Sequence, residues 1–233
     1  MIRSLSCVVP AFNEARNIGA VVEDLLIAAR RVAPDAHEVI VVDDGSTDGT
    51  RDVIEAAARR DAAVVPLIHE RNLGVAATTR DGFAAARYDW IFYVDGDGQF
   101  RIDELERLVP LCAEADLVAG YRIDRADPVH RRMNAALYNR LLRLLFRLPI
   151  RDVNCAFKLI RRDRLLELEC RSESAFFLAE FMIWAQRAGL KIAEAGVHHR
   201  PRRFEDPTGA RPSVVVPALF DVLRCRLGRG AWR

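Results

Sequence analysis

Short apolar and β-branched runs alternate with segments of helical periodicity along the first half of the chain. A short apolar run bounded by turn residues predicts a buried strand, and apolar positions every three or four residues predict an amphipathic helix. We therefore expect strands at Leu5–Pro10, Glu38–Val42, Val64–Ile68, Trp90–Val94 and Asp116–Ala119. The helices expected between them are Ala15–Val32, Thr50–Arg60, Val75–Arg87 and Asp103–Cys112. This alternation predicts an α/β fold with a mostly parallel central sheet and helices on both faces.

The second half of the chain carries fewer clear signals. Helices are expected at Arg131–Leu148, Phe177–Ala188 and Pro217–Leu227, and strands at Ala156–Ile160 and Lys191–His199. Two polar stretches that contain proline, Arg122–His130 and Pro201–Pro212, are expected to be loops. No internal repeat or linker divides the sequence, and 233 residues are enough for one sizeable core. We therefore expect a single domain over residues 1–233.

Charge is distributed unevenly along the chain. Residues 1–121 hold 12 Arg and 21 Asp or Glu, a balance of −9. Residues 122–233 hold 23 Lys or Arg and 12 Asp or Glu, a balance of +11. An acidic half followed by a basic half suits a nucleotide and metal site beside a surface for anionic partners. The alternative is a dipolar surface without such a purpose.

Cysteine usage and hydropathy bear on the compartment. The five cysteines are scattered and form no Cys-x-x-Cys pair, which argues against a disulfide framework or a zinc site and favours a reducing cytosol. Strand-like residues begin by Leu5, which leaves no room for a secretory signal, and no run of about 18 apolar residues occurs. We expect a cytoplasmic protein, with any membrane contact made peripherally at the cytoplasmic face.

The most informative stretch is 90–99, in which five bulky apolar residues are followed by Asp95-Gly96-Asp97-Gly98-Gln99. Asp95 and Asp97 are two positions apart, so in extended backbone their side chains leave on the same side. Two adjacent carboxylates repel and raise one another's pKa unless a cation lies between them. Mg²⁺ and Mn²⁺ take oxygen ligands from carboxylates and substrate phosphates. The motif predicts a metal and diphosphate site, and the alternative is an ordinary Asp-Gly turn.

Polar residues also follow two other expected strands. Asn13 and Glu14 follow the first strand, and Asp43-Asp44-Gly45-Ser46 follow the second, at the same carboxyl edge of the sheet. Ser46, Thr47 or Asp48 can cap the next helix. The start of the helix at Val75 suits a diphosphate, and Arg80 on its second turn either binds phosphate or pairs with neighbouring acids.

These motifs together resemble those of family 2 glycosyltransferases. The resemblance rests on Pro-Ala-Phe-Asn-Glu (10–14), Val-Asp-Asp-Gly-Ser-Thr-Asp-Gly-Thr (42–50), Asn-Leu-Gly (72–74) with Arg-Asp-Gly-Phe (80–83), and Asp-Gly-Asp-Gly-Gln-Phe (95–100). It continues through Gly-Tyr-Arg (120–122), 152–158, 189–192 and Pro-Arg (201–202), where it is most similar to the polyprenyl-phosphate branch. The resemblance implies a GT-A type, Rossmann-like domain that binds a nucleotide sugar and a divalent metal, Mg²⁺ or Mn²⁺.

The resemblance also implies roles for individual residues. The positions that contact the nucleotide in the family match Pro10, Phe12, Glu14, Val42 and Asp44. Those that hold metal and diphosphate match Asp95, Asp97 and Gln99, and those that hold phosphates match Arg122, Arg202 and, more loosely, Arg211. Phe12 stands where the family usually has Tyr. Gly96 replaces its usual Ala, a mild change at a position that requires a small residue near the donor.

The acceptor decides whether the reaction needs a general base. A sugar or protein hydroxyl must lose a proton, and Glu180 matches an acidic position of the family that could take it. A polyprenyl phosphate is already anionic and can attack unaided. The structural alternative for Glu180 is a carboxylate that complements a helix dipole. We favour inverting transfer of a hexose from a GDP- or UDP-linked donor to polyprenyl phosphate. A hydroxyl acceptor and a non-catalytic nucleotide-sugar-binding module are the alternatives.

On this interpretation residues 1–121 are the nucleotide and metal half, and residues 122–233 form the acceptor half with basic amphipathic helices. The helix at 131–148 carries Arg140, Arg143 and Arg147 against an apolar side made of Met133, Leu137, Leu141, Leu144, Leu145 and Leu148. The last helix repeats the pattern. Such helices bind membrane surfaces or pack on a core with a solvated arginine face. No aromatic residues are interleaved with the cations, so we expect no nucleic-acid partner.

Overall fold

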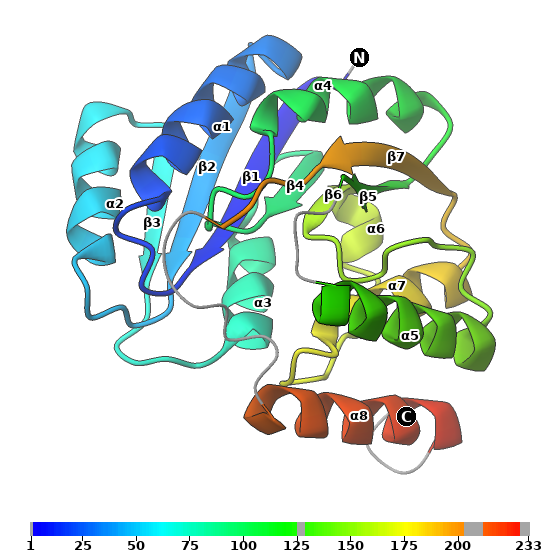
Figure 1. Cartoon of the computed structure of the whole chain (residues 1–233). Helices are drawn as coiled ribbons and strands as arrows, with labels where there is room; N and C mark the ends of the chain where they lie inside the picture. Colours follow the sequence, from blue (N-terminus) through cyan, green and yellow to red (C-terminus); the bar gives the residue numbers. More distant parts are fainter. Residues whose placement is uncertain (1, 125–128, 203–211, 229–233) are drawn as a thin grey trace.

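The computed structural model describes residues 2–124, 129–202 and 212–228, which form a seven-stranded sheet with helices on both faces (Figure 1). The strand order is β3 (Val64–Ile68), β2 (Ala36–Asp43), β1 (Ser4–Ala11), β4 (Trp90–Val94), β6 (Phe157–Arg161), β5 (Leu117–Ile123) and β7 (Ile192–His198). All neighbouring pairs are parallel except those that β6 makes with β4 and β5. The predicted α/β class and the mostly parallel sheet are confirmed.

The strand order reverses between β1 and β4. The chain builds β1, β2 and β3 outward in one direction and then returns to add β4 on the other side of β1. Loops that leave neighbouring strands at such a reversal diverge, so a crevice opens at the carboxyl ends of the strands, where open α/β sheets bind ligands. The residues after β1, β2 and β4, which include both Asp95 and Asp97, meet there.

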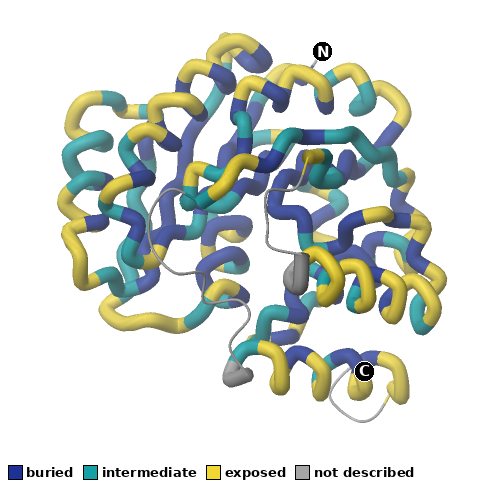
Figure 2. The backbone as a smooth tube through the Cα atoms, viewed as in Figure 1, coloured by how far each residue is buried: buried dark blue, intermediate teal, exposed yellow. Residues whose placement is uncertain are grey.

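Two sets of helices cover the sheet. Helices α1 (Ile18–Val32) and α2 (Thr50–Arg60) lie on one face, and α3 (Val75–Ala85) and α7 (Phe177–Arg187) lie on the other (Figure 1). A glycine allows α3 to approach closely, because a Cβ atom at Gly82 would come within 2.4 Å of Val8 Cγ1 on β1. The Phe83 ring of α3 lies 6.2 Å from that of Phe181, which joins α7 to α3. Figure 2 shows the buried strands between these layers.

The helix expected at Asp103–Cys112 is instead broken into three short pieces. They are η1 (Ile102–Glu104), α4 (Leu105–Leu108) and η2 (Val109–Ala113), and the outer two are 3₁₀ turns. Pro110 explains the break between α4 and η2, because it has no N–H to donate and its ring disfavours a continuous α-helix before it. The apolar spacing correctly predicted a helical segment here, but Pro110 prevents one continuous α-helix.

Other boundaries differ where tertiary pairing decides them. Strand β5 runs to Ile123, so Arg122 lies on a strand and not in the expected loop. Helix α5 is Val129–Phe146, a short unexpected helix α6 is Arg162–Leu165, and α8 (Pro212–Leu227) begins five residues before the expected Pro217. Residues 125–128 and 203–211 of the expected loops lie outside the described residues. Within the described ranges, no helix combines the length and apolar character needed to cross a bilayer.

Candidate active site

Asp95 and Asp97 follow β4 at the reversal of strand order, and they interact electrostatically. Although part of Asp95 remains accessible to solvent, burial of its carboxyl and then repulsion by Asp97 raise its pKa to about 7. Burial also raises the pKa of Asp97. The Tyr93 hydroxyl lies 3.4 Å from Asp95 Oδ1, and the backbone N–H of Gln99 donates to Asp97 Oδ1 at 3.0 Å. Two carboxylates with unfavourable charge are the arrangement that a cation would relieve.

Arg122 lies close enough to this pair for its charge to lower the pKa values of both Asp95 and Asp97. Asp152 fixes its position. Arg122 Nε and one terminal nitrogen donate to the two carboxylate oxygens of Asp152 at 2.7 and 2.9 Å. A bidentate pair of this kind orients the planar guanidinium. The structure therefore brings Arg122 from β5 to the carboxylates that follow β4.

Arg202 approaches from the other end of the sequence. Its charge also lowers the pKa of Asp95 and Asp97, and it forms an ion pair with Glu14, which accepts a hydrogen bond from Asn17 Nδ2 at 2.7 Å. Gln99 brings this segment to the site. Its side-chain Nε2 donates to the Arg200 carbonyl at 2.9 Å, and the Arg200 N–H donates to the Gln99 carbonyl at 2.7 Å.

The loops that follow β1 and β2 are tied together by side chains. Asn13, which has a positive φ of 56°, receives the Thr47 N–H on its Oδ1 at 2.9 Å and donates its own N–H to Ser46 Oγ at 2.9 Å. Ser46 and Thr47 therefore join this loop to its neighbour. Of the three residues expected to cap α2, Asp48 accepts the N–H of Thr50, the first residue of the helix, at 3.1 Å. Phe12, which lies between Pro10 and Glu14 in the sequence, is 41% exposed beside these loops, and Val42, the last residue but one of β2, is buried.

Asp44 and Arg80, which were expected to contact the donor, have partners within the protein. The Asp44 carboxylate is buried and accepts hydrogen bonds from His69 Nδ1, the Leu73 N–H and the Gly74 N–H, each at 2.8 Å. A carboxylate therefore already occupies the start of α3, which makes that helix terminus a poor site for a diphosphate. Arg80 donates to the Ser172 carbonyl at 2.9 Å and lies 5.6 Å from the centre of the Phe177 ring. Of the two interpretations of Arg80, this geometry favours the structural one.

Gly96 is required by the protein core. A Cβ atom at this position would lie 2.9 Å from the Pro10 carbonyl oxygen and 3.2 Å from the Ile18 side chain. Contacts below about 3 Å force a shift of the backbone or of its neighbour. The exchange of Ala for Gly is therefore not mild in this chain, because β1 and α1 approach closely at this position.

Glu180 lies on the first turn of α7 and is fully buried. Its carboxylate accepts the backbone N–H groups of Arg171 and Ser172 at 2.7 to 3.0 Å and Trp184 Nε1 at 3.2 Å. Burial is the main reason that its pKa is raised. Three donors surround it, none from the crevice, so it anchors the 171–172 segment. This position does not support the predicted role as a base.

Three residues that support the site were not predicted from the sequence. Asp152 lies in a motif to which no role was assigned, and Tyr93 was expected only as an apolar residue of a strand. Lys158, one of two lysines in the chain, is buried and donates to the Val153 and Cys155 carbonyls at 3.1 and 2.5 Å, so it holds the turn after Asp152. A charged residue inside an apolar strand was the available signal for Lys158. Arg211 lies outside the described residues.

The donor set suits a hard divalent cation bound together with a substrate. Asp95 and Asp97 supply carboxylate oxygens, and the backbone N–H of Gln99 holds one oxygen of Asp97 in place. In the described part of the chain no cluster of three or more His, Cys, Asp or Glu residues forms a complete metal site. Such a cation would need oxygens from elsewhere, and diphosphate oxygens are its usual complement.

This fold and site define a GT-A type α/β glycosyltransferase. A family model described as "Glycosyl transferase family 2" matches residues 6–168, so the chain belongs to that family. Undecaprenyl-phosphate 4-deoxy-4-formamido-L-arabinose transferase of Yersinia pestis (strain Pestoides F) is 28% identical over 228 residues, which cover 96% of this chain and 68% of the relative.

Solved structures agree on the fold. Glucosyl-3-phosphoglycerate synthase from Mycobacterium tuberculosis, crystallised with Mn²⁺, UDP and glucosyl-3-phosphoglycerate, superposes with a TM-score of 0.73 at 20% identity over 97% of this chain and 80% of that one. Its complex with Mn²⁺, UDP-glucose and phosphoglyceric acid gives a TM-score of 0.75 at 20% identity, with the same coverage. The expectation of an enzyme of the glycosyltransferase class is confirmed, and the alternative of a binding module is not.

Proposed function

We propose that this glycosyltransferase moves a hexose from a nucleotide sugar, GDP- or UDP-linked, to a polyprenyl phosphate, with inversion at the anomeric carbon. The observation that carries the proposal is the convergence of Asp95, Asp97, Arg122 and Arg202 at the switch point of the sheet. Two carboxylates for a cation beside two arginines for phosphate oxygens suit a nucleoside diphosphate leaving group. The relative that acts on undecaprenyl phosphate supports the acceptor class.

The base and the diphosphate of the donor each have a matching surface. The exposed ring of Phe12 can pack on the base, and the braced loops after β1 and β2 form the wall beside it. Asp95 and Asp97, with Gln99, would hold Mg²⁺ or Mn²⁺ against the diphosphate. The cation, when bound, neutralises charge that grows on the departing nucleoside diphosphate. Arg122 and Arg202 donate to the same oxygens, and Asp152 and Glu14 hold these two guanidinium groups in place.

The acceptor requires no base on this proposal. A phosphate monoester is anionic at neutral pH, so its oxygen can attack the anomeric carbon directly while the bond to the diphosphate breaks. This chemistry accords with Glu180, which is enclosed by N–H donors. Direct displacement by the acceptor inverts the anomeric configuration.

The surface of α5 and α8 supports an approach to the membrane, where such an acceptor resides. Met133, Leu137, Leu141 and Leu144 form an exposed row on α5, with Leu137 70% and Leu144 71% exposed. Leu142 and Leu148 face the interior, so the apolar row lies outside together with the arginines. An exposed face that is both apolar and basic suits an anionic bilayer surface, with about 1 kcal/mol for each basic residue near it. The proposal places this contact at the cytoplasmic face.

Transfer assays test the proposal. Purified protein is given a panel of labelled GDP- and UDP-sugars with Mn²⁺ or Mg²⁺ and undecaprenyl phosphate in detergent. We expect a lipid-linked product from one donor, with the opposite anomeric configuration, and its loss with chelator or in Asp97→Asn. Transfer to hydroxyl acceptors but not to the lipid phosphate would overturn the proposed acceptor, and full activity in chelator would overturn the metal.

A further inference from the structure

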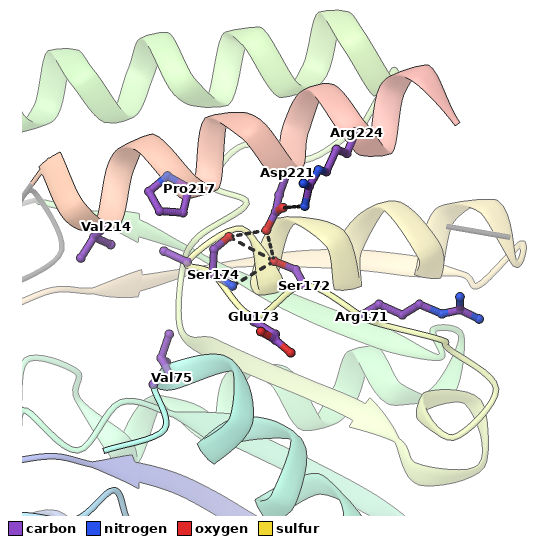
Figure 3. Close-up of a pocket in the computed structure, with 11 residues that line it drawn as sticks. Val75, Arg171, Ser172, Glu173, Ser174, Val214, Pro217, Asp221 and Arg224 are labelled. Carbon is purple, nitrogen blue, oxygen red and sulfur yellow. Dashed lines mark hydrogen bonds and ion pairs between the residues drawn. The ribbon is translucent and has the colours of Figure 1, made fainter. Parts of the chain in front are cut away.

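A cavity of about 500 Å³ lies between the start of α3, the 171–175 segment before α7, and α8 (Figure 3). Its volume is typical of sites that enclose a small ligand, which span about 300–1,000 Å³. Val75 comes from α3, Ala175 from the segment before α7, and Val214 and Pro217 from α8. Three elements that are far apart in sequence therefore build one pocket.

Four of the polar residues that line this pocket interact with one another, and Arg171 and Glu173 line it as well. Ser172 Oγ and Ser174 Oγ donate to Asp221 Oδ2 at 2.8 and 2.7 Å, and Arg224 lies 3.9 Å from the other oxygen of Asp221 (Figure 3). Hydroxyls that are already bonded do not require a polar ligand. Beside these bonded groups the pocket presents to a ligand the apolar surface of Val75, Ala175, Val214 and Pro217.

The pocket is joined to the carboxylate pair through α3. Thr79 Oγ1 donates to the Val75 carbonyl at 2.7 Å and lies 3.4 Å from the Tyr93 hydroxyl, which is itself 3.4 Å from Asp95 Oδ1. Arg80 of the same helix reaches the Ser172 carbonyl on the pocket wall. One turn of α3 and the Tyr93 hydroxyl thus lie between the apolar pocket and the proposed reaction centre.

The outer wall of the pocket continues into the exposed apolar surface. Helix α8 contributes Val214 and Pro217 to the pocket, and its outward side chains include Val215, Leu219, Phe220 and Leu223. Helix α5 runs alongside α8 in Figures 1 and 3. An apolar chain that enters from a bilayer would keep contact with apolar side chains from the surface to the pocket.

We infer that this pocket holds the isoprenoid units next to the acceptor phosphate, while the phosphate itself points past α3 to the carboxylate edge. The inference rests on the proposed function and adds the site that selects an isoprenoid over a hydrophilic acceptor. A phosphate would be poorly placed in the pocket itself, because Asp221 and Glu173 line it together with its arginines. Burial of apolar groups is favourable in proportion to the area removed from water, so enclosure of a few isoprene units favours this acceptor over a hydrophilic one.

Filling the pocket tests this site. Ala175→Phe and Val214→Phe add bulk from opposite walls, and Ala20→Phe adds the same bulk on the exposed face of α1 as the control. We expect the two pocket variants to raise the KM for undecaprenyl phosphate about tenfold or more, equivalent to about 1.4 kcal/mol. The KM for the nucleotide sugar should stay within about twofold, and the control should match the wild type.

A second measurement does not depend on how the variants fold. Undecaprenyl phosphate with a photoreactive diazirine in the isoprene unit nearest the phosphate should label wild-type peptides that contain Ala175 or Val214. Transfer by the wild type with labelling elsewhere, or with unchanged acceptor KM in both folded variants, would overturn the pocket assignment alone. A wild type that binds donor but never transfers to this lipid would overturn the proposed function, and the pocket assignment with it.

Discussion

Arg122 and Asp152 form a two-pronged ion pair, with nitrogen to oxygen distances of 2.7 and 2.9 Å, at the edge of the sheet where Asp95 and Asp97 lie. The two partners come from β5 and from the turn before β6, and neither side chain is much exposed. Asp152 therefore keeps a cation oriented toward two carboxylates, and Lys158 stabilises the turn that follows Asp152. The ion pair predicts that Asp152 acts by positioning Arg122, and this role can be tested.

Asp152→Asn should lower kcat/KM for the donor about 10- to 100-fold, because the asparagine amide can accept only one of the two Arg122 bonds. The apparent pKa of the activity should also rise, since a displaced Arg122 no longer lowers the pKa of Asp95 and Asp97. Steady-state kinetics from pH 6 to 9 measure both effects. The control is Asp163→Asn, which breaks an exposed pair with Arg161 and should change neither. An unshifted pH profile in Asp152→Asn would leave Asp152 with a stability role only.

Asp95→Asn should stabilise the metal-free protein while it abolishes transfer. Burial and Asp97 raise the pKa of Asp95 from 3.8 to about 7, so between these pH values the folded state holds a proton that the unfolded chain releases. The free energy of unfolding therefore falls as pH rises through this window. Asparagine carries no charge, and we expect a gain of about 1–2 kcal/mol at pH 8 and almost none at pH 4. Urea unfolding in the presence of chelator measures this gain in the free energy of unfolding. A loss of stability at pH 8 would contradict the proposed cost of the buried Asp95 charge.

The Mn²⁺ concentration that the enzyme needs should vary with pH, because the pKa of Asp95 is raised. A bound cation requires ionised Asp95 and Asp97, and protons compete with it below the raised pKa of about 7. At limiting Mn²⁺, activity should fall up to about tenfold for each pH unit below 7. Saturating Mn²⁺ should move this decline to lower pH. A decline at limiting Mn²⁺ that saturation does not move would indicate that another group controls the profile.

The fold was predictable because local pattern and tertiary structure agree in its first half. The observed bounds of α2, β3 and β4 match those expected at Thr50–Arg60, Val64–Ile68 and Trp90–Val94. Buried parallel strands are continuous apolar runs, and the crossover helices between them are amphipathic. The pattern failed at Pro110, where one backbone constraint interrupts a periodic segment, and at Arg122, whose strand pairing with β7 is not local.

The site was predictable only as a set of residue types at strand ends. Spacing identified Asp95 and Asp97, and the structure adds what spacing cannot contain, namely the partners of each group. Asp44 and Arg80 have polar side chains in the right motifs, yet each is bonded to protein groups at 2.8 to 2.9 Å. Asp152 reaches Arg122 across 30 residues of sequence. Such pairings depend on packing between β5 and β6, which no short motif records.

Glu180→Gln separates the two acceptor hypotheses. The carboxylate accepts three N–H donors in a fully buried position, and the amide NH₂ of glutamine would face one of them. We expect a loss of about 2–4 kcal/mol in the free energy of unfolding. Transfer to polyprenyl phosphate per folded molecule should remain within about threefold, because no step needs a base. Thermal unfolding measures the loss of stability, and kcat at a temperature at which the variant is folded measures the transfer. A thousandfold fall in kcat without unfolding would restore Glu180 as a base.

The exposed apolar row on α5 should govern membrane binding separately from chemistry. Leu137 and Leu144 are 70% and 71% exposed, so Leu137→Glu with Leu144→Glu introduces two charges without disturbing the core. Each change removes apolar area from the membrane contact and adds repulsion from anionic lipid, so binding to vesicles of about 30% anionic lipid should fall at least tenfold. The matched control is Leu166→Glu, at a 57% exposed leucine beyond α6, which should bind as the wild type does. Activity on detergent-dispersed acceptor should persist in both, whereas activity on acceptor in vesicles should fall only in the α5 variant. If the α5 variant sediments with vesicles as well as the control does, this row is not a membrane contact.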